Sequence, residues 1–261
     1  MKKDEMKEAL RQFVCDYVRR YGREHDCAWL WREPLTGFAD ANCEYIKNVE
    51  QAVGTEHRQP ADYLAEPTIV ISCFAPFSRE LSRTNANVEG NLASKEWVSA
   101  YAQTNDMLGQ LAQAVADKVC ELGYHGAVPT KINMKEGILK SPWSHRHIAF
   151  AAGLGTFGIN NMLITEAGCC GRYCSIVTDL PVTPDQILEE ENCLYKRNGS
   201  CRKCVDRCFS GALTTEGFDR FLCFETCMRN HKLYGHEVCG KCATEVPCAF
   251  TAPGRAKAEA K

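Results

Sequence analysis

The distribution of cysteine constrains this chain more than any other feature. The chain has 17 cysteines, and nine of them fall between Asn192 and Lys261. The charged start, Met1 to Glu8, has no apolar stretch of the kind that begins a secretion signal, so we expect a cytoplasmic protein with reduced thiols. An odd number of cysteines also fits poorly with a complete set of disulfides. This density of thiols predicts a metal-binding module in the C-terminal part of the chain.

Composition narrows the class of protein further. With 45% hydrophobic and 25% charged residues, the 261-residue chain has the make-up of a folded globular protein of one or two domains. No apolar run approaches the roughly 18 residues that cross a membrane, so we expect no membrane partner. The net charge of −2 results from 31 basic and 33 acidic residues, which argues against a surface built to bind nucleic acid.

Apolar periodicity predicts an α/β architecture for residues 1–185. Helical spacing predicts amphipathic helices over residues 6–21 and 97–122, each ended by a glycine. The β-branched run Thr68–Phe74 predicts a buried strand. Further expected elements are a polar loop over residues 78–94, short strands over 126–129, 162–165 and 174–178, and a short helix over 148–152. Two prolines near residue 185 mark a linker, so we expect an α/β domain over 1–185, a cysteine-rich domain over 186–250 and a flexible tail over 251–261.

The spacing of the C-terminal cysteines is similar to that of two-cluster ferredoxins. Cys201, Cys204 and Cys208 are separated by two and three residues. In the ferredoxin pattern the C-x2-C pair binds one [4Fe–4S] cluster, and the cysteine after x3 binds the other. Asn198 stands where the first cysteine of that pattern would be, and Cys193 is the nearest upstream substitute. This exchange rule predicts a first cluster held by Cys193, Cys201, Cys204 and Cys248, and a second held by Cys208, Cys223, Cys239 and Cys242.

Two other interpretations of these cysteines stay open. The pairs Cys201/Cys204 and Cys239/Cys242 could together form a four-cysteine zinc site, which would leave the other cysteines of the module without a role. Cys227 lies four positions after Cys223 and could replace it as a cluster ligand, or could simply be spare.

The chain also resembles the epoxyqueuosine reductase family. The stretch Ala152–Asn161 corresponds to the family's A-G-L-G-W-I-G-K-N, and Thr178-Asp179 to its later T-D. The cysteine run then closes on Cys208-Phe-Ser-Gly-Ala-Leu, where the family has C-P-T-G-A-[IL]. The segment Gly217–Cys223 is similar to the family's D-x-x-x-C element, and the segment from Tyr234 to Cys242 to its Y-G-C-D-x-C close, with three additional residues. The resemblance covers nearly the whole chain, weakly before residue 145 and more specifically after it.

This resemblance implies a fold, cofactors and a chemistry. It implies a nitroreductase-like α/β sandwich of the corrinoid-binding type, followed by a ferredoxin-like module with two [4Fe–4S] clusters. Reductive dehalogenases are distant relatives of the family. Electrons from an external donor such as a ferredoxin or flavodoxin would pass through the clusters to cobalamin, the group that carries the difficult chemistry. The resemblance places the cofactor near Gly153, Leu154, Gly155, Gly158 and Asn160, and catalytic groups at His145 and Arg146.

Departures from the family limit what the resemblance implies about the substrate. The family motif D-[ST]-G-P-V-x-E-R matches Pro142 and Arg146, but Leu139 stands where the aspartate belongs and His145 where the glutamate belongs. A leucine has no proton to donate, so His145 or His147 would have to replace it, since imidazole titrates nearest neutral pH. The longer family members carry HEAT-type repeats that help to bind tRNA. This sequence has no such repeat and no basic stripe, so we expect a small-molecule substrate rather than tRNA.

Two further motifs have alternative interpretations. The glycines at 153, 155 and 158 spell G-x-G-x-x-G, but a helix before them and a strand after them is the wrong order for a dinucleotide site. They either let the backbone approach a large flat cofactor or form a tight turn. Cys169, Cys170 and Cys174 match no family ligand, and we interpret them as buried or turn thiols, with a redox role as the alternative.

The sequence therefore predicts an iron–sulfur oxidoreductase that passes electrons through two [4Fe–4S] clusters to cobalamin for reductive chemistry on a small substrate. One alternative is a non-catalytic, ferredoxin-like electron carrier without cobalamin. The second is a zinc-stabilised binding protein. The identity of the substrate and the oligomeric state cannot be read from the sequence.

Overall fold

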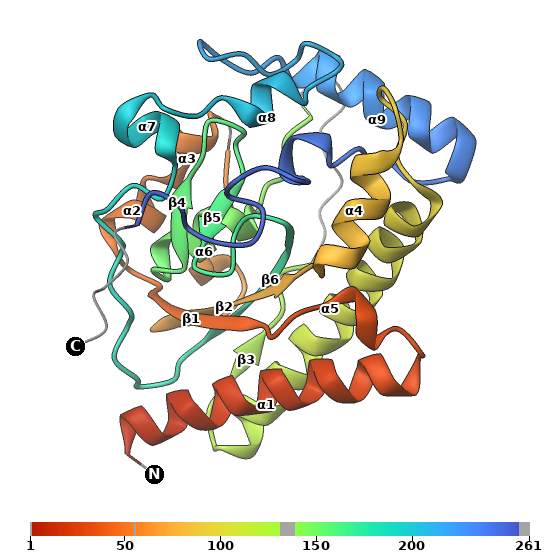
Figure 1. Ribbon diagram of the computed structural model, residues 1–261. Helices are drawn as coiled ribbons and strands as arrows, with labels where there is room; N and C mark the ends of the chain where they lie inside the picture. The colour runs from red at the N-terminus through yellow and green to blue at the C-terminus, as the bar shows by residue number, and fades with distance from the viewer. Residues whose placement is uncertain (1, 55, 131–138, 256–261) are drawn as a thin grey trace, which may run out of the picture. The chain divides into compact units, whose positions relative to one another are not determined.

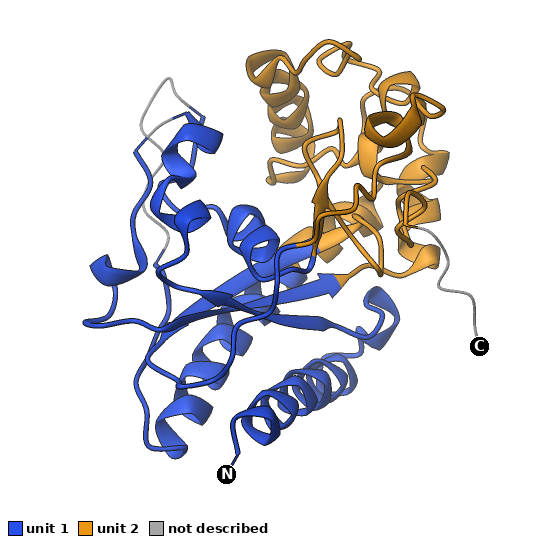
Figure 2. Cartoon of the chain, turned by 90° about the vertical axis from the view of Figure 1, so that its left-hand side faces the viewer, with its two compact units in different colours: residues 1–75, 104–154, 172–187 blue, residues 76–103, 155–171, 188–261 orange. Residues whose placement is uncertain are grey.

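The computed structural model describes residues 2–54, 56–130 and 139–255, and it divides into two compact units. Unit 1 consists of residues 1–75, 104–154 and 172–187, and unit 2 of residues 76–103, 155–171 and 188–261 (Figure 2). The predicted division at residue 185 lies close to the last crossing of the chain between units. The second unit, however, also takes in two earlier segments that sequence spacing assigned to the first domain.

A four-stranded sheet with the strand order β1-β2-β6-β3 forms the centre of unit 1 (Figure 1). Its strands are β1 (Leu35–Asp40), β2 (Ile69–Pro76), β6 (Gly171–Thr178) and β3 (Gly126–Ala127). The pairs β1–β2 and β3–β6 are antiparallel, with Phe38 opposite Ile71 in the first pair. Every residue of β2 is buried, which explains why its sequence reads as a continuous apolar run rather than an alternating one.

Helices cover both faces of this sheet, as Figures 1 and 2 show. The helical elements that lie in unit 1 are α1 (Lys3–Glu24), η1 (Ala28–Leu30), α2 (Glu44–Lys47), α3 (Val49–Val53), η2 (Pro60–Asp62), α6 (His145–Ala151) and most of α5 (Lys95–Glu121). On one face α6 packs through Ile148 and Ala152 against Val70 and Val177. The sheet is therefore a buried central layer, and the start of α6 is held against it.

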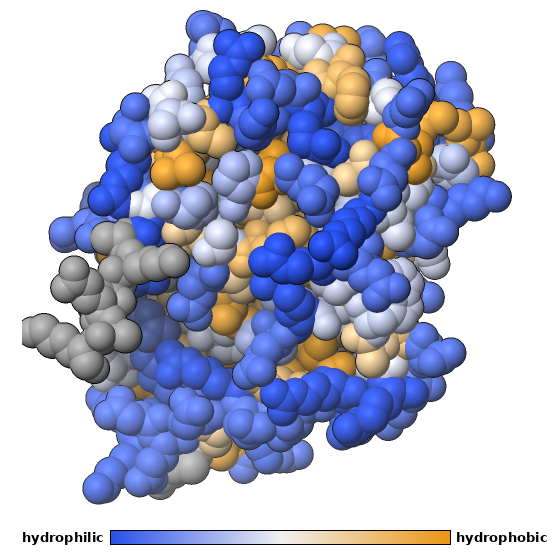
Figure 3. Space-filling view, viewed as in Figure 1, coloured by the Kyte–Doolittle hydropathy of each residue, from blue (hydrophilic) through white to orange (hydrophobic). Residues whose placement is uncertain are grey.

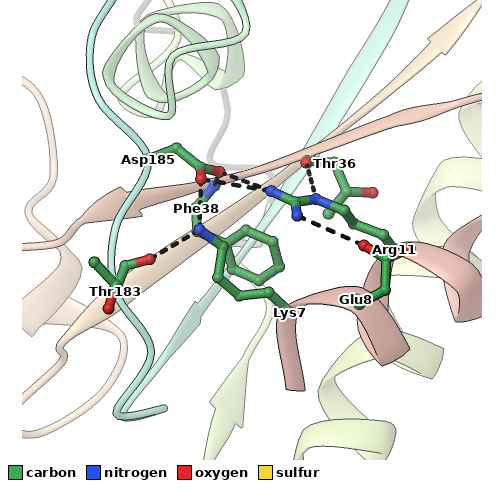
Figure 4. Close-up of polar contacts among 7 residues, drawn as sticks. All are labelled: Lys7, Glu8, Arg11, Thr36, Phe38, Thr183 and Asp185. Atoms are coloured by element: carbon green, nitrogen blue, oxygen red, sulfur yellow. Dashed lines mark hydrogen bonds and ion pairs between the residues drawn. The ribbon is translucent and has the colours of Figure 1, made fainter. Parts of the chain in front are cut away.

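A polar cluster joins α1, β1 and the segment before residue 188 (Figure 4). The Asp185 carboxylate accepts hydrogen bonds from Lys7 Nζ at 2.5 Å, Arg11 Nη2 at 3.3 Å and the Phe38 N–H at 3.0 Å. Lys7 Nζ also donates to the Thr183 carbonyl at 3.0 Å, and both cations lie over the Phe38 ring. Lys7 is only 8% exposed, so its ammonium depends on these partners.

Unit 2 is built from short elements around a two-stranded sheet. Its strands β4 (Gly155–Phe157) and β5 (Leu163–Thr165) pair antiparallel. Its helical elements are α4 (Arg79–Asn87), the first turns of α5, α7 (Leu194–Asn198), α8 (Lys203–Asp206), α9 (Arg220–Tyr234) and η3 (Lys241–Ala243). Ser78 caps α4 by accepting from the Leu81 N–H, and Asp219 caps α9 by accepting from the Leu222 N–H.

The long helices and the buried strand were predicted correctly from sequence periodicity. The structure of a polar stretch was not. Expected helices over 6–21 and 97–122 correspond to α1 and α5, and the strand over 68–74 corresponds to β2. The predicted loop over 78–94 is wrong, because residues 79–87 form α4. Its interior is polar since Asn85 and Ser82 are buried against other parts of unit 2 instead of facing solvent.

The last described residues are attached to unit 2. The predicted flexible tail began at residue 251, but the Gly254 N–H donates to the Asn192 carbonyl at 2.9 Å and Ala252 is buried. The rest of the predicted tail, 256–261, lies outside the described residues.

The protein surface and the helix lengths are the features relevant to membrane binding. The face in Figure 3 is mainly hydrophilic with apolar patches between polar side chains. Within the described ranges, no helix combines the length and apolarity needed to cross a membrane.

Candidate metal centres

Four of the predicted ligands line one pocket in unit 2. Cys193 is the N-cap residue of α7, Cys204 lies in α8, and Cys201 lies in the turn between these two helices. Cys248 reaches the same pocket from the turn that follows η3. The cavity of this pocket is small, about 20 Å³, and it opens to solvent. The four residues assigned to the first cluster by spacing are thus brought together by the fold.

The remaining lining of this pocket is mostly apolar, and Asn160 contributes a polar side chain to it. It consists of side chains from the β4–β5 segment and from the loops around Cys248, including Ile159, Ile164, Leu194, Val246, Pro247 and Pro253. Burial and the neighbouring thiols of Cys248 and Cys193 raise the pKa of Cys204 to about 12. A cation would therefore displace protons from these thiols as it binds.

The second predicted set also lies together in unit 2. Burial, followed by the nearby Cys239, Cys223 and Cys208, raises the pKa of the Cys242 thiol. Cys208 follows α8, and Cys223 is in the first turn of α9. Cys239 lies just before η3, and Cys242 lies within it. Cys204 of the first set also acts on the Cys242 thiol, so the two predicted sets adjoin each other in unit 2.

Cys227 is one helical turn from Cys223 on α9, and the two thiols form a hydrogen bond. That hydrogen bond lowers the pKa of Cys223 to about 7 and raises the pKa of Cys227. The two thiols therefore lie close enough for their protonation to be linked.

The loop that carries Cys239 and Cys242 is fixed by buried polar contacts to α4. The Lys241 side chain lies between α4 carbonyls, donating to Asn85 O at 2.6 Å and also to Val88 O. Asn85 Nδ2 in turn donates to the Cys239 carbonyl at 2.9 Å. Lys241 is 2% exposed, so this buried cation satisfies carbonyls at the C-terminal end of α4. Sequence spacing gave no signal for this role of Lys241.

Single-ion and cluster sites differ in how far apart their ligands lie. Among the described residues, no three His, Cys, Asp or Glu side chains are close enough together to hold one metal ion. A zinc site needs four ligands around one centre, whereas in a [4Fe–4S] cluster each thiolate binds a different iron, which spreads the ligands apart.

The predicted catalytic residues lie at the start of α6 in unit 1. His145 is the first residue of this helix, and its Nδ1 is 2.8 Å from Ser175 Oγ on β6. Ser175 Oγ also accepts a hydrogen bond from Trp143 Nε1 at 2.9 Å. The serine hydroxyl thus links the indole of Trp143 to the imidazole of His145. Arg146 follows in the same turn and is half-buried.

His147 is held in the neutral form. Burial, with the charge of Arg146 as the next cause, lowers the pKa of His147 to about 4. Its Nδ1 lies 2.7 Å from Ser144 Oγ. At neutral pH this ring is therefore not an imidazolium and is a poor general acid.

His57 supports the same helix start and was missed by the sequence analysis. Its Nε2 accepts from the Ser144 N–H at 2.7 Å, and its Nδ1 lies 2.7 Å from the Arg58 carbonyl. The carbonyl only accepts, so the proton is on Nδ1 and the ring is neutral, in agreement with a pKa lowered by burial. A lone histidine in a polar stretch offers no periodic or motif signal.

Two of the glycines predicted to face a corrinoid, Gly153 and Gly155, face protein main chain, and Gly158 faces the side chains of Asn160 and Ile164. A Cβ atom on Gly155 would lie 2.2 Å from the Ile164 carbonyl oxygen, and one on Gly153 would lie 2.2 Å from that of Gln186. Gly153 and Leu154 belong to unit 1, and residues 155–161 to unit 2. The positions fit close packing of the chain on itself, and they do not form a cradle that a cofactor would fill.

Asn160 contacts two cysteine-bearing loops of unit 2. Its Nδ2 donates to the Cys242 carbonyl at 3.0 Å and lies 3.9 Å from Cys169 Sγ. Its Oδ1 accepts from the Met162 N–H at 3.2 Å, which fixes the orientation of the amide. Asn160 is 5% exposed and also lines the four-cysteine pocket, so its amide lies between that pocket and the Cys242 loop.

Comparison with known proteins agrees with the resemblance seen in the sequence. No protein-family model matches the chain. Epoxyqueuosine reductase of Bacillus subtilis is 32% identical over 36% of this chain. The aligned part is 27% of that relative's length, so the match covers about a quarter of the curated protein.

Similarity of fold extends over most of the chain. A structure of epoxyqueuosine reductase with an epoxyqueuosine-modified tRNA-Tyr stem loop has a TM-score of 0.58 at 16% identity, covering 95% of this chain and 66% of the other. A reductive dehalogenase, for which a B12-dependent mechanism is suggested, has a TM-score of 0.55 at 16% identity, covering 80% of this chain and 28% of the other. The chain thus has the mixed α/β fold of these proteins, and the predicted resemblance is confirmed.

Proposed function

We propose that this epoxyqueuosine reductase-like chain is an iron–sulfur oxidoreductase that holds two [4Fe–4S] clusters in unit 2 and serves a reductive reaction on a small molecule. The observation that carries the proposal is the pocket lined together by Cys193, Cys201, Cys204 and Cys248. These residues come from three separate segments of the chain, and metal ligation explains why four thiols converge in an otherwise mostly apolar lining.

The chain's own residues define two ligand sets. The first is the four-cysteine pocket, and the second is Cys208, Cys223, Cys239 and Cys242. Bound clusters would supply sites that accept and release single electrons. The mostly apolar lining of the first pocket would exclude water from its cluster, and Cys227 would donate a hydrogen bond to the sulfur of Cys223. An external donor such as a ferredoxin or flavodoxin remains our proposal for the source of electrons.

In unit 1 we assign proton transfer to His145. The Ser175 hydroxyl holds Nδ1 of this imidazole, and Trp143 holds the serine in turn. This fixes the orientation of the ring at the start of α6. Leu139, which stands in the place of the family's acid, offers no proton, and Arg146 beside His145 would favour an anionic substrate or transition state. The tRNA of the relatives is not proposed as a substrate, because the net charge of −2 does not favour binding a polyanion.

Cobalamin is implied by the relatives, and we derive no step through it. Gly153, Gly155 and Gly158 pack against protein atoms, so the residues predicted to contact a corrinoid do not fit that role. This observation favours a second candidate function, an electron carrier that uses its clusters without cobalamin. The two candidates share unit 2 and differ in what receives the electrons.

Metal and sulfide analysis after anaerobic purification tests the main proposal. We expect brown protein with iron and acid-labile sulfide in equal amounts. Colourless protein that contains only zinc would refute the iron–sulfur assignment and support the zinc alternative.

Single substitutions test the ligand sets. Cys208→Ala should remove the second cluster and leave the first, and Cys248→Ala should do the reverse. Cys120, an exposed thiol on α5, provides the matched control, and Cys120→Ala should retain all the iron. If Cys208→Ala instead removed the same cluster as Cys204→Ala, the exchange assignment would be wrong.

Titration with cob(II)alamin separates the enzyme from the carrier. Binding would be followed anaerobically by electron paramagnetic resonance, which distinguishes base-off from free cob(II)alamin. A base-off spectrum would support a corrinoid enzyme, whereas an unchanged spectrum at high protein concentration would support the electron carrier.

A further inference from the structure

Cys169 is a buried thiol outside both ligand sets, and it lies against one of the proposed ligands. Its Sγ is 3.9 Å from Cys248 Sγ, and the residue has no solvent exposure. Cys248 faces the first pocket, whereas Cys169 does not line it. The thiol of Cys169 is therefore positioned behind a ligand rather than as one.

The main chain fixes this placement. The Cys169 N–H donates to the Cys248 carbonyl at 2.9 Å, and the Cys170 N–H donates to the Ala249 carbonyl at 3.1 Å. A Cβ atom on Gly168 would lie 2.3 Å from the Ala249 carbonyl oxygen. The two segments therefore approach as closely as main chains can, and Gly168 is required for this approach.

The direction of the hydrogen bonds follows from the chemistry of the donors. Asn160 Nδ2 points at Cys169 Sγ and only donates, so Cys169 is the acceptor in that contact. The single S–H proton of Cys169 is thereby left for Cys248. A cysteine that ligates iron is a thiolate and only accepts. The chain of donors thus runs from Asn160 to Cys169 to Cys248.

We infer that Cys169 is a positioning residue that donates an S–H hydrogen bond to the Cys248 ligand and raises the reduction potential of the first cluster. This inference rests on the proposed function. When the cluster takes up one electron, negative charge on its ligand sulfurs increases, and a donor to such a sulfur stabilises the reduced state. No bond forms or breaks in this step, and the proton stays on Cys169.

Redox titration of the whole protein tests the role of Cys169. The two clusters should give two midpoint potentials, followed by electron paramagnetic resonance of the reduced states. In Cys169→Ala we expect one midpoint to fall, with the reduced-to-oxidised ratio at fixed potential about threefold lower. That change corresponds to about 30 mV at 59 mV per tenfold for one electron. The other midpoint and the iron content should not change.

Two variants serve as controls. Cys169→Ser keeps a donor at the same position and should have a midpoint between those of the wild type and Cys169→Ala. Cys170→Ala removes the neighbouring buried thiol, and it should leave both midpoints in place.

The possible outcomes distinguish a failure of this inference from a failure of the proposed function. Unchanged midpoints in Cys169→Ala, in protein with its full iron content, would overturn the inference and leave the proposed function intact. Loss of one cluster in both Cys169→Ala and Cys169→Ser would also overturn it, because Cys169 would then be a ligand. Wild-type protein without clusters would refute the proposed function itself.

Discussion

Replacement of Asp185 is the most direct test of how unit 1 is held together. Its carboxylate accepts from Lys7, Arg11 and the Phe38 N–H, and these three partners lie on α1 and β1. Asp185→Ala removes the only carboxylate that these contacts share. Lys7, with 11% of its side chain exposed, would keep the Thr183 carbonyl as its hydrogen-bond partner but would lose its counter-charge.

The magnitude follows from the burial of each partner. Removal of one member of a fully buried pair costs about 3–5 kcal/mol. The side chains of Asp185 and Arg11 are 27% and 38% exposed, so solvent screens part of that loss. We expect Asp185→Ala to lower the free energy of unfolding by about 2–4 kcal/mol, and Asp185→Asn by about 1–2 kcal/mol, because the amide still accepts a hydrogen bond. Lys7→Met should cost less than Asp185→Ala, since the carboxylate retains two donors.

Urea unfolding followed by tryptophan fluorescence measures these differences, and the Lys7→Met/Asp185→Asn double mutant gives the coupling energy. The absorption of any bound clusters in native buffer serves as the control that unit 2 is intact. A loss below about 0.5 kcal/mol in Asp185→Ala, the range of an ordinary surface substitution, would refute the reasoning.

Three further predictions concern other parts of the chain. Cys223→Ala should lose half of the iron and Cys227→Ala should keep it, as measured by metal analysis; equal losses would mean that both thiols are needed. The pKa of His147 is lowered from 6.5 to about 4, so between these pH values the unfolded chain takes up a proton that the folded chain does not. The unfolding free energy should therefore fall by about 1 kcal/mol per pH unit as pH drops below 6.5, and His147→Asn should flatten this slope; parallel pH profiles would contradict it. Gly155→Ala should cost about 2–3 kcal/mol because its Cβ would overlap a carbonyl oxygen of the facing strand, whereas Gly217→Ala, with open space around it, should leave the melting temperature nearly unchanged.

Local sequence patterns predicted the helices that bury one continuous face and the strand that is buried on both faces. The periodicity of α1 and α5 and the apolar run of β2 each reflect one buried face or one fully buried strand. The helix α4 was missed because its buried positions include the polar residues Ser82 and Asn85, and the Asn85 amide donates to the distant Cys239 carbonyl. Polarity signals a loop only when polar groups face solvent, and here they bond to main chain elsewhere in unit 2.

The candidate metal centres likewise combine residues that the sequence predicted with contacts that it did not. Spacing alone grouped eight cysteines into two sets, and the structure places the four of the first set around one pocket. Spacing could not reveal that Cys227 forms a hydrogen bond with Cys223, or that His57 holds the start of α6. These contacts join residues that carry no motif, so only coordinates identify them.

The sequence by itself determined which cysteines group together, because a ligand pattern is set by short turns whose geometry depends on a few neighbouring residues. It also determined the resemblance to epoxyqueuosine reductases. Tertiary structure decided what lies beside those ligands. The thiol of Cys169 lies against Cys248, the ammonium of Lys241 binds the Asn85 carbonyl of α4, and the main chain of β5 packs against Gly155. Each of these contacts joins segments far apart in the sequence, and burial gives such contacts their energetic weight.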